Sequence, residues 1–168
     1  MSDTTSQQWL WSAPLPDAIS GVIHELRMPV VTMRNALDLT HQFTSCRAYQ
    51  SHYPILRTHT DCLSAHIDQL FDLRAQFERP AQQGDNIPPY AAAITFVQAI
   101  ISSLRNDLHG LQPDMQTAHA NCYADLETKM QPLFMLAQTN AKGFLEAIQL
   151  LLVDGLLQRL RNEERGMQ

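Results

Sequence analysis

Apolar residues at steps of seven run through the second quarter of the chain. They are Leu56, Leu63, Leu70 and Phe77, with Ile67 in the other core row. A seven-residue repeat is typical of a helix that packs along a partner at a shallow angle. The repeat predicts a helix that opens at Pro54, because proline is favoured in the first helical turn. The polar stretch before it, residues 44–53, is then expected to be a turn.

A second amphipathic segment precedes this helix. Between residues 17 and 45 apolar side chains recur at steps of three and four, with Asp17 as N-cap and Pro29 as an internal kink. Two helices joined by a short turn form an antiparallel hairpin, and an isolated hairpin exposes an apolar stripe. We therefore expect a four-helix bundle made by two chains, a homodimer.

The organisation of the chain follows from its proline- and glycine-rich stretches. Residues 1–16 are polar and end in two prolines, which favours a flexible or loosely docked arm. The hairpin then occupies 17–79, a linker 80–89, and a separate C-terminal region 90–168. No internal repeat is visible in the sequence.

The C-terminal region leaves two fold classes open. A third helix should end near Gly110 as its C-cap, residues 115–122 read as a short strand, and a fourth helix surrounds 126–137. For residues 148–160 the alternatives are a β-hairpin turning at Asp154 and Gly155, or one helix, which composition favours. The fold class is thus mainly α, with a C-terminal region that is either helical or a degenerate α/β unit.

Composition excludes several partner classes. The net charge is −5 with only 12 Lys and Arg, which argues against nucleic acid. Three cysteines without a CxxC pair suit a reducing compartment. The start of the chain lacks the features of a signal peptide, and its apolar stretches are too short for a bilayer. We expect a cytoplasmic protein without membrane partners.

The segment ISGVIHELRMPVVTMRNALDL (19–39) carries the chemical motif: His24, Glu25, Leu26, Arg27 and Pro29. It resembles the H-box of the histidine kinase dimerisation and phosphotransfer domain, whose pattern is His-Glu-Leu-Arg-Thr-Pro-Leu. Residues 67–78, IDQLFDLRAQFE, resemble the closing segment of that domain's second helix.

This resemblance implies that His24 is the phosphorylated residue. A neutral imidazole keeps one nitrogen free as a nucleophile, Glu25 can fix the tautomer, and Arg27 can offset phosphoryl charge. The family usually has Thr or Asn four residues after the histidine, where it is implicated in phosphatase action. Met28 stands there, so phosphatase activity is doubtful.

Residues 125–144 faintly resemble the Asn-bearing helix of the family's ATPase domain, through Asn140-Ala141-Lys142. However, Met135 occupies the position of the first functional asparagine, and the glycine-rich nucleotide boxes are absent from the sequence. We expect no cofactor and no autokinase activity. The chain resembles the stand-alone histidine phosphotransferases that carry a degenerate ATPase remnant.

Two functional hypotheses follow. In the first, the chain relays a phosphoryl group between receiver domains through His24, and the receiver supplies the magnesium. In the second, it is a non-catalytic interaction protein that binds a response regulator or a histidine kinase as a decoy or inhibitor. A coincidental resemblance in an unrelated helical protein is a third reading.

Other chemistry-bearing residues have simpler explanations. His52, His59 and His66 are seven apart, which is about 10 Å along a helix and too far to share a metal. We expect rim histidines and no metal site. Trp9 and Trp11 suit either a partner-binding anchor or packing of the arm on the bundle.

Overall fold

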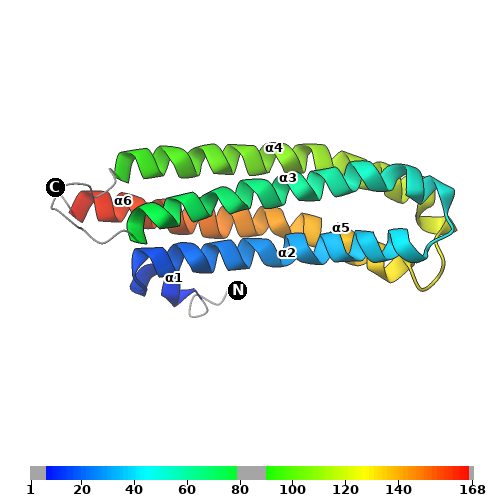
Figure 1. The fold of residues 1–168 in the computed structure, drawn as a ribbon, viewed down its shortest axis with the longest axis horizontal. Coiled ribbons are helices and arrows are strands. Elements are labelled where there is room, and N and C mark those ends of the chain that lie inside the picture. The colour runs from blue at the N-terminus through cyan, green and yellow to red at the C-terminus, as the bar shows by residue number, and fades with distance from the viewer. Residues whose placement is uncertain (1–6, 79–89, 167–168) are drawn as a thin grey trace.

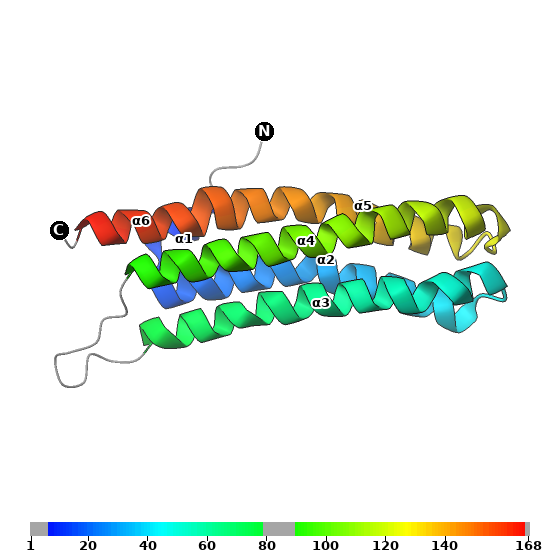
Figure 2. The same cartoon turned by 90° about the horizontal axis from the view of Figure 1, so that it is seen from above.

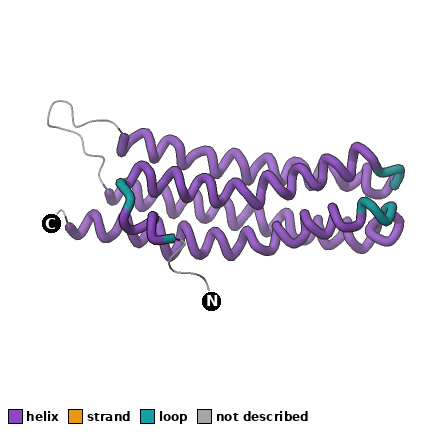
Figure 3. The backbone as a smooth tube through the Cα atoms, turned by 90° about the horizontal axis from the view of Figure 1, so that it is seen from below, coloured by secondary structure: helices purple, strands orange, loops and turns teal. Residues whose placement is uncertain are grey.

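Four long helical segments lie side by side in the computed structural model, which describes residues 7–78 and 90–166 (Figure 1). They are α2 (Leu15–Phe43), α3 (Arg47–Glu78), α4 (Tyr90–Cys122), and the unbroken run of α5 (Gln131–Ala147), π-helix η2 (Ile148–Leu156) and α6 (Leu157–Gly166). The short α1 (Gln8–Ser12) and the 3-10 helix η1 (Tyr123–Asp125) complete the fold. The mainly α prediction is confirmed, and the described ranges contain no strand (Figure 3).

Each segment packs between two neighbours. Helix α2 lies between α3 and α5, and α4 lies between α3 and the α5–α6 segment, so α2 and α4 are diagonally opposite (Figure 2). One hydrophobic core runs through both halves of the chain. The apolar stripe that we expected a second chain to cover is therefore covered by the C-terminal region, which is helical and shares its core with the hairpin. The linker expected at 80–89 lies outside the described residues.

The start of α3 differs from the prediction. Residues 47–53 are helical, so the expected turn through Tyr53 is wrong and Pro54 lies inside the helix. Tyr49 is fully buried and its hydroxyl donates to the carbonyl oxygen of Leu37 at 2.7 Å. This contact with α2 stabilises about two helical turns at the start of α3, before Pro54, which the local sequence does not predict. Likewise α2 begins at Leu15 after an N-cap at Pro14, not after Asp17.

Helix α4 does not end at Gly110, and the possible strand over 115–122 is helical. A Cβ built on Gly110 would lie 2.7 Å from Cε1 of His59. This glycine therefore permits close approach of α3 rather than capping the helix. Of the two alternatives for residues 148–160, the helix is right, and Asp154 and Gly155 lie within η2.

Histidines spaced seven residues apart on α3 meet polar residues spaced seven apart on α4. The pairs are His52 with Asn121 (3.2 Å), His59 with Asp114 (2.7 Å) and His66 with Asp107 (2.5 Å). Because the helices are antiparallel, a single register satisfies all three pairs. The expected rim histidines thus form a polar ladder along the α3/α4 seam.

Helices α2 and α5 pack together although they are not consecutive in the sequence. Contacts at both ends of this α2/α5 seam hold them in place. At one end Glu127 accepts hydrogen bonds from Thr44 Oγ1 (2.7 Å) and from the Ser45 backbone N and Oγ (both 2.8 Å). At the other end Leu10 of α1 is buried against Gly155, where a Cβ would lie 2.3 Å from its Cδ2. Arg159 Nη1 donates to the Leu10 carbonyl oxygen at 2.8 Å.

The arm expected over 1–16 is thus folded where it is described. Residues 8–12 form α1, which the contacts of Leu10 hold against the bundle, and α2 already begins at Leu15. Residues 1–6 lie outside the described part of the chain.

The two hairpins share part of a buried pattern, although the sequence shows no visible repeat. At one constant offset, Ile19, Val22, Leu26, Val30 and Met33 of α2 correspond to Val97, Ile100, Leu104, Leu108 and Leu111 of α4. At the same offset, Leu56, Leu63, Leu70 and Leu73 of α3 correspond to Phe134, Ala141, Ile148 and Leu151 of the α5–η2 run. All of these side chains are buried.

In the part of the chain that the structure describes, no helix combines the length and the apolar character needed to cross a membrane.

The hydrogen bonds at Glu127 predict a pH-dependent stability. Led by the one from the Ser45 backbone, they lower the pKa of this carboxyl group from 4.5 to about 2. A carboxylate whose pKa is depressed in the folded state stabilises the fold above its unfolded pKa and loses that effect as pH falls. In thermal unfolding followed by circular dichroism, Glu127→Gln should melt below the native protein at pH 7, and the gap should close between pH 4.5 and 2.

Glu146→Gln is the matched control, because Glu146 is an exposed glutamate of the following helix. A Glu127→Gln gap that stays constant across this pH range would show that the carboxylate does not act through its charge.

Candidate functional site

His24 lies on the outer ridge of α2, opposite the core. Its neighbours Ile23 and Leu26 are buried, whereas His24 itself is exposed. At 3.6 residues per turn, the same ridge continues through Met28 and Val31, whose exposed fractions are 54% and 47%. An imidazole open to a partner thus stands beside two exposed apolar side chains.

Arg27 lies on the side of α2 that faces α3. Its guanidinium pairs with Asp68 and sits 4.9 Å from the ring centroid of Phe71. The pair is largely exposed, so its contribution to stability is small, about 0–1 kcal/mol. Phe71 provides a flat surface on which the guanidinium is held.

A second guanidinium, from Arg74, lies over the same ring at 5.1 Å. Its Nη1 donates to Ser20 Oγ at 3.1 Å, and Ser20 is one helical turn before His24. Its Nε also lies 3.0 Å from Glu78. Two cationic groups and one aromatic ring therefore line the α2/α3 seam along the turns that carry His24.

Sequence reasoning missed Phe71 and Arg74. Both lie in the segment 67–78, which was noted only for its resemblance to a closing segment. Pairing the antiparallel helices by register would have placed them opposite Ser20 and Arg27.

The structure brings His24 and Arg27 to the same side of α2, but not Glu25. Adjacent helical residues point about 100° apart, whereas residues three apart are neighbours. Glu25 is exposed and makes no hydrogen bond with His24, so the expected contact that fixes the tautomer is absent between these two described residues.

Trp9 of α1 lies one turn from His24 on the other flank. A Cβ on Gly21 would lie 2.4 Å from the Trp9 ring, so the indole packs directly on the backbone of α2. Trp11 is 48% exposed. Of the two alternatives for these tryptophans, packing describes Trp9, while Trp11 presents its side chain to solvent.

A polar cluster near the α2/α3 turn closes the same seam. Tyr53 donates to Asp38 at 2.5 Å, Arg57 pairs with the same carboxylate, and His41 stacks on Tyr53. Burial raises the pKa of Asp38, but these hydrogen bonds outweigh it, so the pKa lies below its usual value. Asp38 of α2 is thus bound by Tyr53 and Arg57 of α3, and the cluster holds the two helices together.

The corresponding ridge of α4 is different. At the offset that matches the buried positions, His24, Glu25 and Arg27 correspond to Ser102, Ser103 and Arg105. The residues in place of Met28, Pro29 and Val31 are Asn106, Asp107 and His109. The first helices of the two hairpins therefore share buried positions and differ along this outer ridge.

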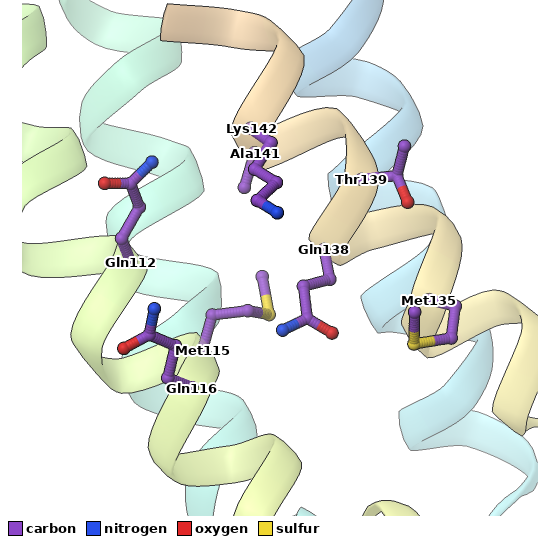
Figure 4. Close-up of a pocket in the computed structure, with 8 residues that line it drawn as sticks. All are labelled: Gln112, Met115, Gln116, Met135, Gln138, Thr139, Ala141 and Lys142. Carbon is purple, nitrogen blue, oxygen red and sulfur yellow. The ribbon is translucent and has the colours of Figure 1, made fainter.

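The other candidate is a hollow of about 380 Å³ between α4 and α5 (Figure 4). Lys142 and Gln138 of α5 and Met115 of α4 point into it. His24 does not line it, and its lining residues include one cationic group, Lys142, and neither a carboxylate nor an imidazole. Asn140, from the segment resembling an ATPase helix, donates to Leu136 within α5 at 2.8 Å.

Among the residues that the structure describes, no three His, Cys, Asp or Glu side chains are grouped so that they could hold a metal ion.

No family model matches the chain, and comparisons with curated proteins and with solved structures found no match either.

The contact of Trp9 with Gly21 predicts the effect of Gly21→Ala. Alanine in a helix interior is favoured over glycine by about 1 kcal/mol, but here its Cβ must displace the indole. We expect no stability gain and a red-shifted tryptophan emission, measured by thermal unfolding and fluorescence.

Gly143→Ala on α5 is the matched control, because a Cβ there meets nothing within 4 Å. It should gain about 0.5–1 kcal/mol without a change in emission. If Gly21→Ala behaved in the same way, α1 would not be docked at this site.

Proposed function

We propose that this chain relays a phosphoryl group between receiver domains through His24. One observation carries the proposal: on the first hairpin an exposed histidine lies along the same turns as two guanidinium groups held on Phe71, whereas a serine holds the corresponding position on the second hairpin. Bundle packing does not require the exposed imidazole of His24, so its chemistry needs another explanation. In phosphoryl transfer the imidazole is the acceptor and the guanidinium groups offset the charge.

The step needs one nucleophilic nitrogen. The lone pair of a ring nitrogen of His24 attacks phosphorus on the receiver's aspartyl phosphate while the P–O bond to the carboxylate breaks. The carboxylate leaves with the electron pair, and the second ring nitrogen keeps its proton. Transfer to another receiver is the same step reversed.

Arg27 and Arg74 counter the charge of the bound phosphoryl group. A guanidinium binds phosphoryl oxygens through charge-assisted hydrogen bonds. Both are held on Phe71 near His24, which lowers the entropy lost when they turn to the phosphate. The contact of Arg27 with Asp68 is exposed to solvent, whereas that of Arg74 with Ser20 is partly buried.

The chain acts in this proposal without ATP and without a metal of its own. The phosphoryl donor is the receiver, which also brings its magnesium. Met28 is exposed near His24 and offers no hydrogen-bonding group that could orient a hydrolytic water, so the proposal includes no phosphatase activity. Free thiols at Cys46, Cys62 and Cys122 favour a reducing compartment such as the cytoplasm.

The second candidate is a non-catalytic protein that binds a response regulator or a histidine kinase as a decoy. The exposed apolar pair Met28 and Val31 favours it, because these side chains can bind a partner without any transfer. The two functions differ in their need for His24.

Replacing His24 with alanine separates them. Purified receiver domains carrying labelled phosphate should transfer acid-labile label to the native protein and none to His24→Ala. The exposed position makes the substitution neutral for folding, which circular dichroism will verify. Receivers that bind both proteins and label neither would leave only the interaction protein.

The role of Arg27 predicts a slower transfer in Arg27→Gln. Losing one charge-assisted hydrogen bond to the phosphoryl group should reduce the labelling rate about tenfold. Arg105→Gln is the matched control, since Arg105 holds the corresponding place on α4 and donates to Gln149 at 3.0 Å. Equal rates for the two variants would remove Arg27 from the chemistry.

A further inference from the structure

The two hairpins of this chain are arranged as two copies of one hairpin would be. Many of their buried residues match at a single offset, as the pairs Leu26 with Leu104 and Leu63 with Ala141 illustrate. The match is closest between α2 and α4, whereas in the second segments buried Ile67 corresponds to exposed Leu145. Helix α2 packs between its own partner α3 and the other hairpin's second segment, and α4 does the same in reverse. If the hairpin α2–α3 is exchanged with the hairpin α4–α6, every helix keeps equivalent neighbours, as it would in a two-fold symmetric dimer.

One polar contact at the edge of the core has an approximate counterpart in the other hairpin. Arg27 on α2 reaches Asp68 on α3, and Arg105 on α4 reaches Gln149 on η2. In both hairpins an arginine of the first helix thus bridges to the second segment, although the position equivalent to Asp68 is Glu146 rather than Gln149. The polar ladder has no counterpart, because the positions equivalent to His59 and Asp114 are Ala137 and Ala36.

The exchange fails on the outer ridge of α4. Ser102 stands in place of the acceptor His24, and Asn106 and His109 stand in place of the apolar Met28 and Val31. Asp107, in place of Pro29, is held by His66 within the polar ladder. The ridge of α4 has neither a nucleophilic imidazole at this position nor an apolar surface beside it.

We propose that the hairpin formed by α4 to α6 takes the place that the α2–α3 hairpin of a second chain would occupy in a dimer. The chain therefore works as a monomer with one docking face. One receiver domain binds per chain, over the α2 ridge at His24, Met28 and Val31, and the α4 ridge takes none. This inference rests on the proposed function for the identity of the partner. A symmetric dimer of hairpins offers two such faces, whereas this chain offers one.

The count of bound receivers tests the inference. The 168-residue chain is titrated with the tightest-binding member of a panel of purified receiver domains carrying beryllium trifluoride on their aspartate. Light scattering and calorimetry give the mass and the stoichiometry. We expect a free mass of one 19.0 kDa chain and a complex with one receiver.

Other stoichiometries overturn the inference in distinguishable ways. Two receivers on one chain would show a second working face, and two chains with two receivers would show that the second hairpin does not replace a second copy. Both outcomes leave the proposed relay intact. No binding by any receiver would overturn the inference and the proposed function together.

Exchanging ridge residues locates the face. Met28→Asn with Val31→His gives α2 the residues of α4 and should weaken receiver binding at least tenfold. Asn106→Ala with His109→Ala is the control on the exposed ridge of α4 and should leave binding unchanged. If only the α4 variant lost binding, the receiver would dock on the α4 hairpin instead of the α2 hairpin, and the inference would be overturned.

Discussion

Burial of one continuous apolar stripe on α2 determines the rest of the molecule. Leu26 and Met33 are fully buried because α3 and α5 close on the two flanks of the helix. Burying a leucine is worth about 1.5–3 kcal/mol, so the rotation of α2 about its axis is strongly fixed. Once the stripe is buried, the opposite ridge must face solvent. The exposure of His24 follows from the packing of residues that it does not touch.

This constraint explains what could be predicted from the sequence. The spacing around Leu26 predicts both the helix and an outward His24, and the structure agrees with each. The spacing does not reveal what covers the apolar stripe of α2, because a second chain and a second hairpin of the same chain offer equivalent apolar surfaces. The buried pattern shared by α2 and α4 was hidden for a related reason, since Val30 and Leu108 are interchangeable in a core but not identical in a sequence.

The elements that were predicted wrongly depend on contacts between distant segments. Gly110 reads as a helix end until the His59 ring occupies the space of its missing side chain. Tyr49 extends α3 because its hydroxyl finds a carbonyl group on α2. The candidate site has the same character, since Arg74 becomes a neighbour of Ser20 only when the register of the hairpin is known. Local propensity contains none of this information.

The seam between α2 and α5 has a consequence for the order of folding. The contacts within each hairpin join helices that are adjacent in sequence, whereas the bonds that fix the ends of this seam join Thr44 to Glu127 and Leu10 to Arg159. Contacts between such distant residues form late, after the loop entropy of closing the chain has been met. Interactions that are absent from the transition state mainly set the unfolding rate. The five-residue helix α1 and the carboxylate of Glu127 should therefore act mainly on the unfolding rate of the bundle.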